Sequence, residues 1–163
     1  MTLPPDGVFN FRDVGGLPLA TGGVTTSGIL YRSAALSGLT LAGLEQLAAT
    51  DIGVIVDFRT AAERQMAPDR VPTSRPFRVV ELPLLEGAVT GLAQQGSSAD
   101  PAAVAQMAAK ILAQLPALGD LYVSMLEGGA ASFAEFARLV SQATVTPPTA
   151  VLVHCTAGKD RTG

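Results

Sequence analysis

The sequence predicts an α/β domain with a largely parallel central sheet that is flanked by helices. Residues 53–58 and 150–153 are rich in Val and apolar on both faces, which is the pattern of strands covered on both sides. Stretches with helical spacing lie between the strand-like runs, and strands that alternate with helices favour a parallel sheet. The length of 163 residues is enough for one domain that buries most of its apolar surface.

Two further strands and one loop are expected from local composition. Residues 28–32 (Gly-Ile-Leu-Tyr-Arg) and 77–82 (Phe-Arg-Val-Val-Glu-Leu) are short strand-like runs. Residues 87–99 are rich in Gly, Gln and Ser, which indicates a mobile loop. The four strands together would form the sheet.

The first and third of three expected helices lie on either side of that loop. The first follows residues 37–40, and its apolar residues recur at helical spacing: Leu41, Leu44, Leu47 and Ala48. The third begins with a capping box from Ser132 to Glu135 and carries Phe133, Phe136 and Val140. These apolar side chains are expected in the core.

The second helix has the clearest signals. Asp100 is a suitable N-cap, Pro101 suits the first helical position, and Pro116 ends the pattern. The apolar stripe between them is Val104, Met107, Ala108, Ile111, Leu112 and Leu115.

Composition excludes several classes of function. With 48% hydrophobic residues and a net charge of −3, the chain lacks the basic surface of a sequence-independent nucleic-acid binder. No apolar run approaches the roughly 18 residues that span a bilayer, so stable membrane insertion is not expected. Residues 1–7 lack the pattern of a signal peptide, which favours the cytoplasm or secretion without such a signal. The sequence does not indicate an oligomeric state.

Residues 154–163, His-Cys-Thr-Ala-Gly-Lys-Asp-Arg-Thr-Gly, follow directly after the strand-like run at 150–153. Ligands bind beyond the carboxyl ends of parallel strands, so this loop is expected at the binding edge of the sheet. The backbone N–H groups of six residues could form an anion-binding nest, helped by two small residues that let the chain curl. Those six residues are Thr156, Ala157, Gly158, Lys159, Asp160 and Arg161.

The same loop supplies a nucleophile for phosphate chemistry. Arg161 offers a planar fork for two phosphate oxygens, and a helix that starts near it would direct its N-terminus at the anion. Such surroundings favour the thiolate form of Cys155, which can attack phosphorus and form a phosphocysteine intermediate. Thr162 is placed to donate its hydroxyl to the sulfur when the sulfur leaves.

The pattern His154-Cys155-x5-Arg161-Thr162 resembles the signature loop of protein tyrosine phosphatases and their dual-specificity relatives. Its filling, Ala-Gly-Lys-Asp-Arg-Thr-Gly, is similar to bacterial tyrosine and lipid phosphatases of the atypical dual-specificity type. Residues 10–16, 30–34 and 57–59, with Glu63, resemble upstream landmarks of that family. Together these segments span nearly the whole chain.

The resemblance implies a protein-tyrosine-phosphatase-like fold and a function. Cys155 would be the nucleophile and Arg161 the phosphate clamp of a phosphomonoesterase that needs no cofactor. Lys159 is associated in the family with acceptance of phosphoinositides beside phosphoproteins. The expected partners are therefore a phosphotyrosine protein, with phosphoserine, phosphothreonine and phosphoinositides as further substrates.

A general acid must protonate the leaving group, and three carboxylates are candidates. In the bacterial subgroup the acid follows the strand that corresponds to residues 77–82, and Glu86 stands there in this chain. Asp160 in the loop ranks second and Asp120 third. The alternative for Glu86 is a solvated loop carboxylate.

The only histidine, His154, is not expected to act as a base, because adjacent residues at a strand end point to opposite faces. It is expected to support the loop, with its ring bonded to backbone groups. One Cys and one His cannot supply the usual clustered ligands, so no metal site is expected.

Four charged residues near the predicted strand ends, Arg12, Asp13, Asp57 and Arg59, have two interpretations. They either contact substrate or form an ion-pair network that steadies the loop, and the second is favoured because rigid sites need such support.

The chain stops at Gly163, one turn into the helix expected after the loop, whereas the resembling family continues with further helices. Residues 1–163 are therefore expected to be a single phosphatase domain that lacks its C-terminal helices. A second function stays open on these grounds: a module that recognises phosphate without turnover.

Overall fold

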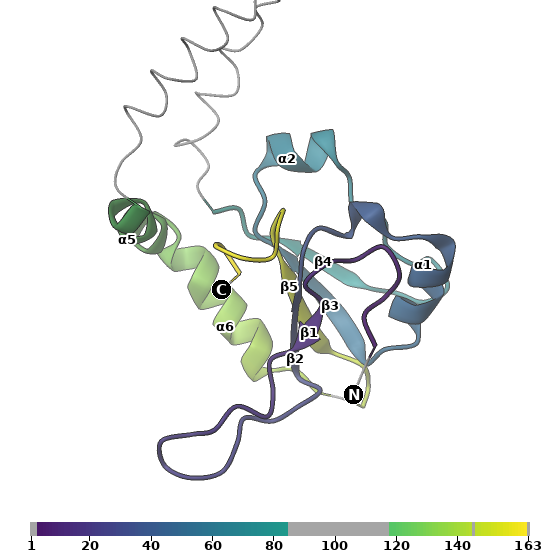
Figure 1. Ribbon diagram of the computed structural model, residues 1–163, viewed down its shortest axis with the longest axis horizontal. Coiled ribbons are helices and arrows are strands. Elements are labelled where there is room, and N and C mark those ends of the chain that lie inside the picture. Colours follow the sequence, from purple (N-terminus) through teal and green to yellow (C-terminus); the bar gives the residue numbers. More distant parts are fainter. Residues whose placement is uncertain (1–2, 85–117, 145, 163) are drawn as a thin grey trace, which may run out of the picture.

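The computed structural model describes residues 3–84, 118–144 and 146–162. Their strands form one sheet in the order β1-β2-β5-β3-β4 (Figure 1). Strands β2, β3, β4 and β5 are parallel, and β1 is antiparallel to β2. The strand bounds are β1 Arg12–Asp13, β2 Leu30–Ser33, β3 Ile52–Asp57, β4 Arg78–Glu81 and β5 Ala150–His154.

Helices cover both faces of this sheet. Figure 1 shows α1 on one side of the sheet and α5 and α6 on the other. The described helices are η1 Leu36–Gly38, α1 Leu41–Ala48, α2 Ala61–Met66, α5 Leu118–Gly128 and α6 Ala130–Ser141. None of them is long and apolar enough to cross a membrane.

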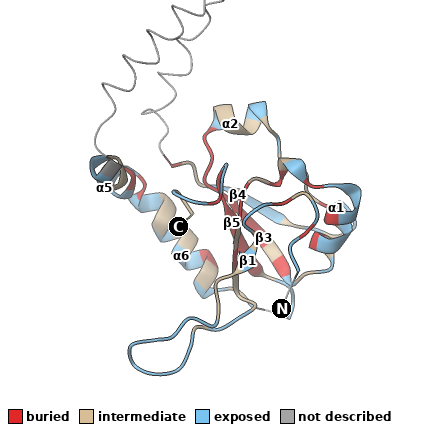
Figure 2. Cartoon of the chain, viewed as in Figure 1, coloured by how far each residue is buried: buried red, intermediate tan, exposed pale blue. Residues whose placement is uncertain are grey.

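The core has two halves, one on each face of β5. Along this strand Val151 and Val153 pack with the α5 and α6 side, whereas Ala150 and Leu152 pack with the α1 side. All five residues of β5 are buried, and Figure 2 shows burial concentrated on the central strands. The buried centre of the sheet therefore ends at His154, directly before Cys155.

The predicted fold class is confirmed, since a mostly parallel sheet carries helices on both faces. All four predicted strands form within one or two residues of their expected bounds. The first predicted helix forms as α1. The predicted helix at 101–115 and the predicted loop at 87–99 lie outside the described residues.

The predicted start of the third helix was wrong. Helix α6 begins at Ala130 with Gly129 as its N-cap, and no side chain caps it. The chain is already helical before this point, and the Gly129 N–H still donates to Met125 O in α5 at 2.9 Å. Ser132 therefore lies within the helix rather than at its end, and Glu135 pairs with Arg138 instead.

Candidate active site

The carboxyl ends of three parallel strands meet at His154. It lies opposite Ser33 of β2 and Asp57 of β3 in the sheet register. Cys155 follows directly, is only 3% exposed, and packs with the core half that contains α5 and α6. The alternation of side chains along β5 thus places the thiol and the histidine on opposite faces, as the sequence predicted.

The loop curls back over the thiol at Gly158. The backbone N–H of Gly158 donates to Cys155 Sγ at 3.2 Å. Its φ is +67°, and a Cβ at this position would lie 2.3 Å from the carbonyl oxygen of Ser33. Both the backbone conformation and the close approach to β2 require glycine here.

Four consecutive carbonyl groups of the loop are bonded from outside. Ala35 N donates to Thr156 O at 3.1 Å, and Asn10 Nδ2 donates to Ala157 O at 2.8 Å. Arg32 Nη2 donates to the oxygens of the next two residues, Gly158 and Lys159, at 2.8 and 3.2 Å. In a trans peptide the N–H points away from the C=O, so the N–H groups that follow these carbonyls are turned toward the inside of the loop. This arrangement is suited to an anion.

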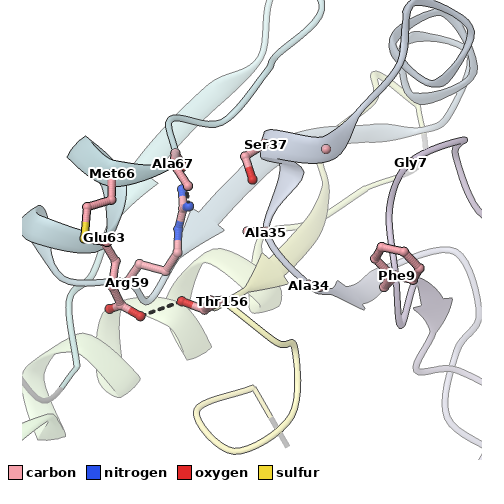
Figure 3. A pocket seen from close by; sticks show the side chains of 11 residues that line it. Gly7, Phe9, Ala34, Ala35, Ser37, Arg59, Glu63, Met66, Ala67 and Thr156 are labelled. Atoms are coloured by element: carbon pink, nitrogen blue, oxygen red, sulfur yellow. Dashed lines mark hydrogen bonds between the residues drawn. The ribbon is translucent and has the colours of Figure 1, made fainter. Parts of the chain in front are cut away.

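Arg161 lies against Glu63, the third residue of α2. Its Nη1 and Nη2 donate to Oε2 and Oε1 of Glu63 at 2.8 and 2.5 Å. Thr156 Oγ1 donates to the same Oε1 at 2.5 Å, which Figure 3 shows as a dashed line. These hydrogen bonds, that of Arg161 first, hold the pKa of the Glu63 carboxyl far below its ordinary value although burial opposes them. The same pairing raises the pKa of Arg161.

Helix α2 places Glu63 by means of a capping box. Thr60 Oγ1 accepts from Glu63 N at 3.3 Å, and Glu63 Oε2 accepts from Thr60 N at 2.9 Å. One carboxylate therefore caps its own helix and holds two side chains of the loop. The pattern Thr-x-x-Glu at 60–63 is the signal in the sequence that predicts this helix start.

Behind the loop, on the α1 face, lies a buried network of four ionisable residues. Arg59 Nη2 contacts Oδ2 of Asp57 at 2.8 Å and Oδ2 of Asp69 at 2.7 Å. His154 Nε2 lies 3.1 Å from Asp69 Oδ2, and its Nδ1 lies 3.3 Å from the carbonyl oxygen of Cys155. Burial acts against ionisation of Asp69, but the contacts with His154 and Arg59 lower its pKa.

Asp57 and Arg59 form an ion pair in this network, beside the loop. The network also corrects the expected surroundings of His154. One ring nitrogen faces a carboxylate rather than the backbone, because the strand end puts it opposite Asp69. Ligand-type atoms of Asp57, Asp69 and His154 lie within 4.8 Å of one another. The guanidinium of Arg59 contacts both carboxylates and supplies the cation at this place.

Arg12 and Asp13 do not join that network, which corrects the expectation of one group of four. Both oxygens of the Asp13 carboxylate accept backbone N–H groups, those of Gly15 and Gly28, each at 2.8 Å. Arg12 Nη1 donates to Asn10 O at 3.0 Å. Both residues belong to β1. The Asp13 carboxylate links Gly15 and Gly28, which lie near the two ends of the connection between β1 and β2.

Two of the three candidate acids, Asp160 and Asp120, lie among the described residues. Glu86, the first choice, lies outside the described residues. Asp160 is in the loop with its side chain 55% exposed, and its Oδ1 accepts from the hydroxyl of Tyr122 in α5 at 2.8 Å. Asp120 is exposed on α5 and makes no hydrogen bond or ion pair with the loop among the described residues.

The end of the loop bears on two expectations. Residues 156–159 form bends and residues 160–162 a turn, and the helix expected from near Arg161 lies almost wholly outside the described residues. Thr162 Oγ1 is buried and has no hydrogen-bond partner, so it does not donate to Cys155. Lys159, in contrast, is 74% exposed with its ammonium 3.7 Å from Asp160 Oδ1, as suits a residue that faces a ligand in solvent.

A pocket of about 320 Å³ borders the loop at Thr156 (Figure 3). Glu63 and Arg59 form its charged wall, and the other lining side chains are small or apolar. Those named in Figure 3 include Phe9, Ala34, Ala35, Met66 and Ala67.

Several residues of this site were not singled out from the sequence. In the sequence, Asn10, Arg32 and Glu63 stand out only as parts of the family landmarks, and Asp69 and Tyr122 belong to no motif. Asp69 carries no such signal. It lies between two prolines in a loop without an apolar pattern, where a charged residue is ordinarily solvated.

Comparison with known proteins identifies the family of this chain. The model of the tyrosine phosphatase family matches residues 3–163. A Cupriavidus necator protein named "Putative tyrosine-protein phosphatase" is 36% identical over 160 residues, which are 97% of this chain and 52% of the relative. A Nostoc commune protein named "Tyrosine-protein phosphatase" is 32% identical over 134 residues, 81% of this chain and 39% of the relative. The chain thus spans about half or less of these relatives, and it belongs to the tyrosine phosphatase family.

Proposed function

We propose that this protein is a cysteine-dependent phosphomonoesterase that hydrolyses phosphotyrosine. The observation that carries the proposal is Cys155 at the centre of a loop whose carbonyl groups are bonded outward and whose Gly158 N–H donates to the sulfur. A phosphate dianion needs inward N–H donors, and the nucleophile needs the same donors to exist as a thiolate.

The reaction has two steps. The Cys155 thiolate attacks phosphorus, so that the S–P bond forms while the bond from phosphorus to the ester oxygen breaks and the general acid protonates that oxygen. Water then attacks phosphorus, gives a proton to the same acid group, and displaces the sulfur. The products are the alcohol or phenol and inorganic phosphate, with the thiolate restored.

Arg161 would bind the phosphate while Glu63 holds it in place. A guanidinium has five N–H donors, and Glu63 takes one from each Nη atom. Arg161 Nε donates to no acceptor among the described residues and is left for a phosphate oxygen. Glu63 is therefore a positioning residue that fixes the plane of the guanidinium before substrate binds.

Glu86 is proposed as the general acid, with Asp160 as the alternative. Asp160 adjoins the phosphate-binding residues and is held by Tyr122, which supports its candidacy. Glu86→Gln should lower kcat and flatten the limb of the pH profile on which activity falls with rising pH. An unchanged profile for Glu86→Gln together with a flattened one for Asp160→Asn would transfer the role to Asp160.

The proposed substrate range extends from phosphotyrosine to phosphoserine, phosphothreonine and phosphoinositides. Its support is Lys159, whose exposed ammonium lies beside the loop and could contact further anionic groups. A panel of phosphopeptides and soluble phosphoinositides, compared by kcat/KM, tests the range. Loss of lipid turnover without loss of phosphotyrosine turnover in Lys159→Ala would support dual use.

An aryl phosphate assay tests the function as a whole. Wild-type protein should hydrolyse the substrate, and Cys155→Ser should reduce the rate by at least about a thousandfold, since the nucleophile is removed. Tight binding of phosphate by the wild type without hydrolysis would instead establish the phosphate-recognition module.

A further inference from the structure

Two arginines lie directly opposite each other on neighbouring strands beside the loop. Arg12 of β1 pairs with Arg32 of β2 in the antiparallel register. Residues that are opposite in such a pair have Cβ atoms about 4.5–5.5 Å apart and point to the same face, and like charges there are destabilising. A bound anion would relieve the repulsion between two cations in this position.

No carboxylate among the described residues pairs with either arginine. The nearest acid in sequence, Asp13, has both oxygens occupied by backbone N–H groups. Arg32 Nε is buried without any hydrogen-bond partner. Burial, and after it the charge of Arg12, lower the pKa of Arg32. The two guanidiniums are thus an uncompensated pair, one exposed and one partly buried.

The pair lies on the same face of the sheet as the nucleophile. Arg32 is opposite Val153 in the parallel register, and Val153 packs in the same core half as Cys155. Arg32 also touches the loop itself, through the carbonyl groups of Gly158 and Lys159. An anion bound by Arg12 and Arg32 would therefore be a neighbour of a phosphate held in the loop.

We propose that Arg12 and Arg32 form a second anion-binding subsite, which takes a second phosphate group of the same substrate. This inference rests on the proposed function and deepens it: among its substrates, small molecules or headgroups that carry two phosphomonoesters should be preferred. Guanidinium groups suit this task because they bind phosphate through charge-assisted pairs of hydrogen bonds.

The test compares phenyl phosphate with the three phenylene bisphosphate isomers at low ionic strength. Either phosphate of a bisphosphate can enter the loop, and this alone should lower KM roughly twofold relative to phenyl phosphate. We expect at least one isomer to exceed that factor, with a KM about tenfold lower than that of phenyl phosphate. Arg12→Ala should remove most of this preference. Arg12 is the informative substitution, since Arg32 also holds the loop. Arg78→Ala is the matched control, because Arg78 is an exposed arginine on β4 at the opposite edge of the sheet.

Three outcomes would overturn the subsite: no isomer is preferred, Arg12→Ala keeps the preference, or Arg78→Ala lowers it equally. Calorimetry with Cys155→Ser separates the subsite from catalysis, because bisphosphate binding should still exceed phenyl phosphate binding when no turnover occurs. If the wild type hydrolyses nothing yet this difference in binding persists, the proposed function fails and the subsite stands. Loss of the difference in the Cys155→Ser/Arg12→Ala double variant confirms that Arg12 carries it.

Discussion

The two sides of the loop at residues 154–163 are built in different ways. On the α1 and α2 side, Asp57, Arg59, Asp69 and Glu63 are engaged with opposite charges or with the loop, and the first two are almost fully buried. On the α5 and α6 side, the cations Arg12 and Arg32 have no carboxylate partner among the described residues. We refer to these as the supporting side and the open side.

The comparison shows that two adjacent residues at the end of β5 face the two different sides. His154 points to the supporting side and Cys155 to the open side, because successive residues of a strand alternate. Substitutions on the supporting side are therefore expected to change stability first, and those on the open side to change substrate handling first.

The largest effect is expected from breaking the buried ion pair. Arg59→Leu leaves the carboxylates of Asp57 and Asp69 buried without their cation, and removal of one partner of such a pair costs about 3–5 kcal/mol. Urea unfolding should show a correspondingly lower free energy of unfolding. Arg138→Leu is the control, since its pair with Glu135 is exposed and should leave the midpoint in place. Equal stability of both variants would contradict a distinct supporting side.

A smaller effect, on turnover, is expected from Glu63. Glu63→Gln should lower kcat for an aryl phosphate about tenfold, because the neutral amide holds the Arg161 guanidinium less firmly. KM should change less than kcat, since Arg161 can still reach phosphate. Glu45→Gln, an exposed carboxylate on α1, should leave both constants unchanged. A loss of stability as large as that of Arg59→Leu would mean that Glu63 acts only as a structural residue.

The same residue predicts an acid-dependent stability. The folded-state pKa of Glu63 lies below its ordinary value near 4.5, so its ionised form stabilises the fold above that pH. The stabilisation is lost as the pH falls through the folded-state pKa. The difference in unfolding free energy between wild type and Glu63→Gln should therefore be full at neutral pH and shrink in strong acid. If the difference in unfolding free energy stayed constant from neutral pH to strong acid, the ionised form of Glu63 would not stabilise the fold.

The smallest effect is expected on the open side, where a single hydrogen bond links Tyr122 to Asp160. Tyr122→Phe should lower kcat only about two- to threefold, because the bond is solvent-exposed and orients one flexible side chain. Ser124→Ala, an exposed position on the same helix, is the control. A loss above tenfold would show that the open side is held as firmly as the supporting side.

Features that depend on local sequence were predictable. Strands β3 and β5 are apolar on both faces because helices cover both, and that pattern is visible without a structure. The loop was recognisable because Cys155, Gly158 and Arg161 lie within seven positions. His154 was correctly placed away from the thiol by strand alternation alone.

Features that depend on distant pairs were not predictable. Glu63 and Arg161 are 98 positions apart, and no local pattern connects them. Ser132 met the rule for a helix start, but the preceding helix α5 continues almost into α6, so tertiary context overrode the signal. The charges of Arg12 and Asp13 predicted an ion-pair group with Asp57. In the structure the Asp13 carboxylate instead accepts hydrogen bonds from two backbone N–H groups.

The central position of β5 has a consequence for the order of events during synthesis. Strands β2 and β3 leave the ribosome early, yet neither pairs with the other, because β5 lies between them and is translated after the other described strands. Until it arrives, two strand edges are open to wrong partners. The cysteine emerges immediately behind the strand that closes this gap. The chain therefore gains Cys155 only after the last described strand of the sheet has been made.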